Sequence, residues 1–252
     1  MTKIFTDHTD RWLTGIGLLA LVGFIGWIDS FFVMWVFLGV IYMFAFYEAM
    51  KLFKLVGPSA YFWAMFLWGT AYFYPSPDDL FFLIAIIFGA SLAYFHNFDQ
   101  RLLLPFLYPV SGVLFFLVLY QDFGIQAMLW LLVTVALTDV GAFFTGKAIG
   151  KTKFSDTSPN KTIEGVIGGV IVATIFGTYV GLHIAPLWIA LIVTFVTSLS
   201  SVFGDLFESY LKREAGVKDS GDLLPGHGGI LDRIDGYLFG APMMIIALRA
   251  FL

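Results

Sequence analysis

The sequence predicts an all-α, polytopic integral membrane protein, because it is rich in apolar residues and poor in charge. Hydrophobic residues make up 59% of the 252 and charged residues only 13%, against about 25% charged in an ordinary soluble domain. So few charges cannot cover a soluble protein of this size, which excludes soluble globular and disordered classes. The net charge of −4 argues against a nucleic-acid partner. The absence of cysteine excludes disulfides and thiolate metal sites.

Apolar runs separated by turn-forming residues predict about nine transmembrane helices, since each needs about 20 mostly apolar residues. The breaks fall at Asp29-Ser30 and at residues 75–79, 96–99 and 121–124, where Pro, Gly, Asn and Asp favour turns. The expected spans cover residues 12–28, 31–49, 55–75, 80–96, 103–120, 125–146, 163–182, 187–204 and 236–252.

Basic residues set the expected orientation, because cytoplasmic loops carry an excess of Lys and Arg. With a cytoplasmic N-terminus, every Lys and Arg except Arg249 falls on the inner side. We therefore expect a protein of the cytoplasmic (inner) membrane whose active site faces the cytoplasm. The first apolar run lacks a cleavage site and is expected to be a retained helix. Residues 1–252 are interpreted as one membrane domain, with N-terminal helices at about 1–122 and a catalytic half at about 125–252.

Charge is concentrated in two segments, 139–164 and 205–235, which together hold more than half of the charged residues. Both segments lie on the expected cytoplasmic side. A transporter is expected instead to place polar groups near the bilayer midplane on broken helices. The clustering favours a site that takes a charged, water-soluble substrate from the cytoplasm and a lipid from the bilayer.

The helix that enters the second segment carries four polar residues on one face, since Asp205, Glu208, Ser209 and Lys212 lie at i, i+3, i+4 and i+7. Asp205 directly follows an apolar span, so its ionised form needs a partner, either a cation or a base such as Lys212. A salt-bridged helix end is the plainer interpretation of the same pattern.

The loop that follows combines a glycine-rich turn, Pro225-Gly226-His227-Gly228-Gly229, with acids and bases on both sides. Glycines let the backbone approach a ligand closely, and successive N–H groups can cradle an anion. Asp232 and Asp235, at i and i+3, would share a face of the last helix. Such carboxylates suit Mg²⁺ held together with substrate phosphates.

The first segment has the features of a phosphate cradle: hydroxyls, Lys161 and the start of a helix at Thr162 and Glu164. A capped, basic loop explains these residues equally well. Asp139 lies inside an apolar run, where a carboxylate is a functional candidate. Glu48, at a helix end, is expected only to reach the membrane interface.

The stretch Ser209–Asp235 resembles the signature of the phosphatidate cytidylyltransferases, also called CDP-diglyceride synthetases. Residues 158–165 and 139–143 resemble two further markers of that family, although Asn160 and Ile163 stand where Lys and Trp are expected. The signature positions are met by Ser209, Leu211, Lys212-Arg213, Lys218-Asp219, His227-Gly228-Gly229 and Asp232-Arg233-Ile234-Asp235.

The resemblance implies a reaction: CMP passes from CTP to phosphatidate, giving CDP-diacylglycerol and pyrophosphate, with Mg²⁺ alone or with a second cation. CTP, phosphatidate and the lipid bilayer are the expected partners, and the resemblance also suggests a homodimer. Two polyanions must meet in such a site, so metal and basic residues are needed to offset their repulsion.

On this hypothesis Asp205 and Asp232 are the main metal ligands, with Asp235 and Asp219 as second candidates. The phosphate groups are assigned to Lys212, Arg213, Lys218 and Arg233. The substrate pocket is assigned to His227, Gly228, Gly229, Ser158, Lys161, Thr162, Glu164, Ser209 and Asp139.

Other functions remain open from the sequence. A cytidylyltransferase that acts on another lipid phosphate, or a CTP-dependent lipid kinase, would need much the same residues. A secondary transporter fits less well, because only Asp139 suggests a polar group at the midplane.

Overall fold

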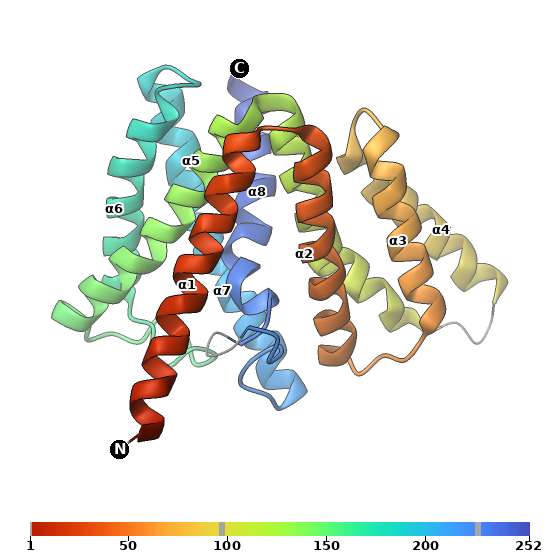
Figure 1. Ribbon diagram of the computed structural model, residues 1–252, viewed down its shortest axis with the longest axis horizontal. Coiled ribbons are helices and arrows are strands. Elements are labelled where there is room, and N and C mark those ends of the chain that lie inside the picture. Colours follow the sequence, from red (N-terminus) through yellow and green to blue (C-terminus); the bar gives the residue numbers. More distant parts are fainter. Residues whose placement is uncertain (1, 96–98, 225–227) are drawn as a thin grey trace. The chain divides into compact units, whose positions relative to one another are not determined.

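The computed structural model describes residues 2–95, 99–224 and 228–252, with side chains from residue 15 onward. The described part is helical and contains no β-sheet, which confirms the expected all-α class (Figure 1). The α-helices are α1 (Thr2–Ile28), α2 (Phe31–Leu52), α3 (Pro58–Phe73), α4 (Leu80–Tyr94), α5 (Ser111–Ile149), α6 (Ile163–Gly181), α7 (Leu187–Ala215) and α8 (Leu231–Phe251). Short helical turns η1 (Pro77–Asp79), η2 (Gln100–Leu103) and η3 (Phe106–Val110) precede α4 and α5.

Helix boundaries follow the turn residues that the sequence contains. Asp29 has a φ of 45° between α1 and α2, and Ser30 occupies the N-cap of α2. Pro58 stands at the start of α3, where its missing N–H costs nothing. Thr162 caps α6, because its hydroxyl accepts a hydrogen bond from the Gly165 N–H over 3.1 Å.

Six described helical segments are long and apolar enough to cross a membrane, which supports a polytopic membrane protein. The expected nine spans are not confirmed. Helix α3 has only 16 residues, and the apolar part described for α1 covers only Gly15–Ile28. The segment Gln100–Ile149 is one of the six, but Gly124, with a φ of 73°, divides its helical part into two helices joined at a kink, at the break expected between the runs 103–120 and 125–146.

The chain divides into two compact units, of which the first comprises Met1–Leu117 and Ala215–Arg233. Its core lies between α2 and α3, where the Tyr42 hydroxyl donates to the Ala64 carbonyl over 3.0 Å and the Trp35 indole donates to the Trp68 carbonyl over 3.1 Å. The loop after α7, although close in sequence to the last helices, belongs to the same unit as the N-terminal helices.

The second unit comprises Val118–Glu214 and Ile234–Leu252. Helix α6 lies directly against α5 (Figure 1), because glycines allow the two backbones to approach. A Cβ on Gly165 would lie 2.8 Å from the Ala142 carbonyl oxygen. Buried hydroxyls join α5 to α7, with Thr138 and Ser198 in contact over 2.7 Å. These contacts fix the helix ends that form the cavity described next.

Candidate functional site

A cavity of about 500 Å³ lies in the second unit, among α5, the loop before α6, the start of α6 and α7. We call it the α5–α7 cavity. Its volume is in the range of small-molecule sites, roughly 300–1,000 Å³. The lining residues are Thr138, Asp139, Ala142, Phe143, Gly146, Lys147, Ser158, Asn160, Lys161, Thr162, Gly165, Val166, Val202 and Asp205. Five of the predicted site residues, from three separate parts of the sequence, therefore share one cavity.

The loop between α5 and α6 is held as a tight turn that presents Ser158 and Lys161. The Phe154 N–H donates to the Lys161 carbonyl over 2.9 Å, and the Lys161 N–H donates to the Ser158 carbonyl over 3.0 Å. The Glu164 carboxylate accepts one hydrogen bond from the Thr152 N–H and another, over 2.9 Å, from the Thr152 hydroxyl. Glu164, predicted to bind substrate, is not among the cavity-lining residues and instead fastens this loop to α6.

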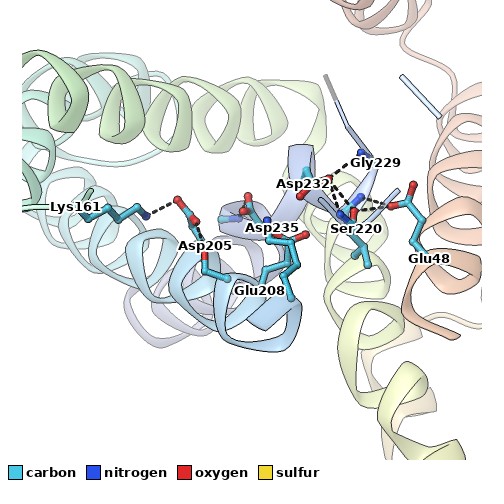
Figure 2. Close-up of polar contacts among 12 residues, drawn as sticks. Glu48, Lys161, Asp205, Glu208, Ser220, Gly229, Asp232 and Asp235 are labelled. Carbon is cyan, nitrogen blue, oxygen red and sulfur yellow. Dashed lines mark hydrogen bonds and ion pairs between the residues drawn. The ribbon is translucent and has the colours of Figure 1, made fainter. Parts of the chain in front are cut away.

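Asp205 forms an ion pair with Lys161 across the α5–α7 cavity (Figure 2). The Ser209 hydroxyl donates to the other carboxylate oxygen over a long 3.4 Å. Both charged side chains are 26% exposed, so the pair is accessible to an entering ligand. Ionised groups in such partly buried surroundings interact more strongly than they do in water.

Asp235 lies beside Asp205 because α7 and α8 approach closely there. A Cβ on Gly204 would lie 3.2 Å from the Gly236 Cα. Asp235 interacts electrostatically with Asp205 and with Asp139. The repulsion among these like charges favours a positively charged partner nearby.

Lys212, predicted to hold phosphate, forms an ion pair with Glu208 one turn earlier on α7, over 2.6 Å. Glu208 is fully buried and Lys212 is 12% exposed. Arg213, the next predicted phosphate ligand, is exposed at the end of the same helix. The sequence correctly placed Asp205, Glu208 and Lys212 on one helical face.

The loop between α7 and α8, residues 216–230, is called the signature loop here. It leads to Asp232, which lies at the start of α8 and belongs to the first unit. One Asp232 oxygen accepts hydrogen bonds from the Ser220 N–H at 2.9 Å, the Ser220 hydroxyl at 3.0 Å and the Gly229 N–H at 2.8 Å. Gly228 has a φ of 79°, a conformation that glycine adopts without strain. Lys218, Asp219 and Arg233 are exposed, and the predicted pocket residue His227 lies outside the described residues.

Glu48, expected only to reach the membrane interface, is instead buried and bonded to the signature loop, so that expectation is wrong. Its side chain is 3% exposed. Its carboxylate lies within hydrogen-bond distance of the Ser220 hydroxyl (Figure 2). It also accepts hydrogen bonds from the N–H groups of Ile230 and Leu231. The sequence signal used for Asp139 could also have found Glu48, because Glu48 is the only acidic residue within the strongly apolar helix α2.

The donor chemistry of the α5–α7 cavity suits a hard cation. Within the described residues, no three His, Cys, Asp or Glu side chains form a group that could hold a metal ion. Mg²⁺ does not require such a group, because it is usually held by one or two carboxylates together with substrate phosphates. Asp139 and Asp205 line the cavity and provide carboxylates of this kind.

The comparison with known proteins agrees with the signature. A model of the cytidylyltransferase family matches residues 9–251. Proteins named phosphatidate cytidylyltransferase from two strains of Helicobacter pylori are 44% identical over 242 residues, which cover 95% of this chain and 91% of each relative. A protein of the same name from Thermotoga maritima is 42% identical over 152 residues, 57% of this chain and 56% of that relative. The chain therefore belongs to the cytidylyltransferase family.

Proposed function

We propose that the chain is a phosphatidate cytidylyltransferase, which transfers CMP from CTP to phosphatidate and forms CDP-diacylglycerol and pyrophosphate. The observation that carries this proposal is the α5–α7 cavity, which brings Asp205 next to Ser158, Lys161 and Thr162 of the upstream loop. The 44% identity to proteins of that name, over 95% of the chain, supports the same reaction.

The reaction is an in-line displacement at phosphorus. A phosphate oxygen of phosphatidate attacks the α-phosphorus of CTP, the new P–O bond forms, and the bond to the bridging oxygen of pyrophosphate breaks. A phosphate monoester is already a nucleophile near neutral pH, so no strong general base is required. Positioning and charge stabilisation carry most of such catalysis.

Positive charge in the α5–α7 cavity supports the binding of two polyanions. Lys161 and Lys147 line it, and Lys161 already lies against a carboxylate. An entering phosphate can share the Lys161 ammonium, because Lys carries three donor hydrogens. Apolar residues line the same cavity, among them Phe143, which is 62% exposed. A lining of both kinds suits a substrate with a charged headgroup and a hydrocarbon body.

Bound Mg²⁺, alone or with a second cation, would offset the negative charge of the reacting phosphates. We propose Asp205 and Asp232 as main metal ligands, with Asp235 and Asp219 as second candidates. Asp205 and Asp235 are supported by the close approach of α7 and α8 at Gly204 and Gly236, the residues next to them. Asp232 is supported by the Ser220 and Gly229 N–H groups, which fix one of its oxygens.

The remaining assignments extend the same proposal. Lys212, Arg213, Lys218 and Arg233 would hold phosphate groups, and His227 with Gly228 and Gly229 would shape the nucleotide pocket. The protein would lie in the cytoplasmic membrane with this site facing the cytoplasm, surrounded by lipid and paired as a homodimer. The apolar helices and the distribution of Lys and Arg support this location.

Position-labelled CTP tests the proposal. Purified protein is incubated with phosphatidate, Mg²⁺ and CTP that carries label on either the α- or the γ-phosphate. Cytidylyl transfer puts α-label into the lipid and γ-label into pyrophosphate. Lipid that carries γ-label would indicate a kinase instead, and preferential labelling of a different lipid phosphate would overturn phosphatidate as the substrate.

A further inference from the structure

The buried carboxylate of Glu48 has no role in the proposed reaction, although its burial costs free energy. It is 3% exposed and lies near the end of α2, a helix apolar enough to cross a membrane. Burial of an ionised carboxylate is tolerated only where hydrogen bonds or opposite charges compensate for the lost water. The partners of Glu48 therefore indicate what the side chain does.

Every hydrogen bond shown for Glu48 comes from the signature loop or the start of α8. One oxygen accepts from the Ile230 N–H over 3.0 Å, and the other accepts from the Leu231 N–H over 2.8 Å and from the Ser220 hydroxyl over 3.0 Å. The first N–H groups of a helix have no partner within that helix. Glu48 thus caps the N-terminus of α8 from a different helix, where negative charge is also favoured by the helix dipole.

Ser220 connects this cap to Asp232. Its hydroxyl lies 3.0 Å from an oxygen of Glu48 and 3.0 Å from an oxygen of Asp232, and its single proton can be donated to only one of them at a time. We call Glu48, Ser220 and Asp232 the Ser220 cluster. A displacement of Glu48 would therefore change both the donor available to Asp232 and the start of the helix that carries it.

The space around the cluster admits no further side chain. A Cβ on Gly229 would lie 2.5 Å from a Glu48 oxygen, and a Cβ on Gly221 would lie 2.5 Å from the other. Such distances are not tolerated without movement of the backbone or of Glu48. Gly221 and Gly229 thus make room for the Glu48 side chain.

We propose that Glu48 is a positioning residue for Asp232. It fixes Ser220 and the start of α8, and through them sets the orientation of a carboxylate assigned to metal binding. This inference rests on the proposed function, and it gives α2, one of the N-terminal helices, a part in catalysis. Removal of such an outer hydrogen-bonding partner costs about 10- to 100-fold in metal affinity or activity.

The test compares Glu48→Gln with Glu214→Gln, which makes the same chemical change at an exposed residue of α7. Three quantities are measured on detergent-purified protein: Mn²⁺ binding by electron paramagnetic resonance, hydrogen exchange of peptides that cover residues 216–233, and turnover against Mg²⁺ concentration. We expect Glu48→Gln to weaken Mn²⁺ binding and raise the Mg²⁺ requirement by about tenfold or more. Exchange should rise in residues 216–233 but stay unchanged in α5 and α6, and Glu214→Gln should match the wild type throughout.

Ser220→Ala keeps the inference falsifiable if Glu48→Gln fails to fold. It removes only the shared hydroxyl, and we expect a weaker change of the same kind. Unchanged Mn²⁺ binding and exchange in a folded Glu48→Gln protein, or in Ser220→Ala if the first does not fold, would overturn the positioning role. Failure of the wild type to label phosphatidate would overturn the proposed function alone, because Mn²⁺ binding and exchange are read without turnover.

Discussion

The α5–α7 cavity and the Ser220 cluster hold their carboxylates in different ways. In the cavity, Asp205 is neutralised by the flexible side chain of Lys161, and both are 26% exposed. In the Ser220 cluster, Asp232 and Glu48 are held by backbone N–H groups and a hydroxyl, and Glu48 is 3% exposed. A lysine can move to an entering phosphate, whereas backbone donors cannot. The comparison indicates that Asp205 can exchange its partner when a ligand enters, whereas Asp232 is held in one position.

The largest effect is expected from Asp232→Asn, which removes the charge of the fixed carboxylate. The asparagine carbonyl oxygen carries no net charge and is a weaker ligand for Mg²⁺. We predict a fall in kcat of more than about 100-fold at saturating CTP. The matched control is Asp222→Asn, an exposed residue of the same loop, which should retain wild-type turnover. Near-normal turnover of Asp232→Asn at limiting Mg²⁺ would show that Asp232 is not a metal ligand.

A smaller effect is expected from Lys161→Ala, which removes the exchangeable partner of Asp205. The loss of one charge-assisted hydrogen bond to phosphate should raise the KM for CTP by about tenfold, with a lesser change in kcat. Steady-state kinetics separate the two parameters. Lys161→Arg should recover part of the affinity, because it restores the charge but not the length of the side chain. If KM is unchanged while kcat falls, Lys161 does not bind the ground-state phosphates.

A packing change tests whether the cavity depends on the close contact of α5 and α6. Gly165→Ala would place a Cβ 2.8 Å from the Ala142 carbonyl oxygen, and we expect a loss of about 1–3 kcal/mol in the free energy of unfolding. Gly89→Ala in α4, where nothing lies within 4 Å, is the control and should not destabilise the protein. Equal thermal stability of the two variants would contradict the close helix contact.

The smallest effect is expected from an ion pair that belongs to neither site. The Arg101 guanidinium, which hydrogen-bonds Asp99, lowers the pKa of that carboxyl below its usual value. Stabilisation of this sign is present above the unfolded pKa, about 3.9, and is lost as the pH falls through the folded value. Because the pair is exposed, Asp99→Asn should lower the Tm slightly at neutral pH and not at all in strong acid. A large drop in Tm at neutral pH would contradict this expectation, because it would mean that even an ion pair more exposed than Lys161 and Asp205 stabilises the protein strongly.

Composition and motif spacing predicted the helical class and most of the residues that the structure brings together. The i, i+3, i+4, i+7 pattern on α7 placed Asp205, Glu208 and Lys212 on one face, but Lys212 pairs with Glu208, and the pairing of Asp205 with Lys161 was not predicted. The shared face could be predicted because helical periodicity is a local property, whereas the contact between Lys161 and Asp205 joins residues that are distant in the sequence. The number of spans was less predictable, since α3 has only 16 residues and the apolar part described for α1 covers only Gly15–Ile28.

Glu48 could not be connected to Asp232 from the sequence. Its partners lie 172 to 183 residues away, and no local pattern encodes such a contact. Its isolation in an apolar helix marked it as unusual but did not identify a partner. The role assigned to Glu164 also depended on tertiary structure, because a carboxylate at a helix start can face either a ligand or its own loop.

The central claim is that this chain joins the CMP of CTP to phosphatidate, and product stoichiometry tests it most directly. Pyrophosphate and CDP-diacylglycerol are measured together, in mixed micelles of phosphatidate with Mg²⁺, for the wild type and for Asp205→Asn. We predict equal amounts of both products from the wild type and at least about 100-fold less of each from the variant. Pyrophosphate without lipid product, or an intact wild-type preparation that forms neither, would contradict the account.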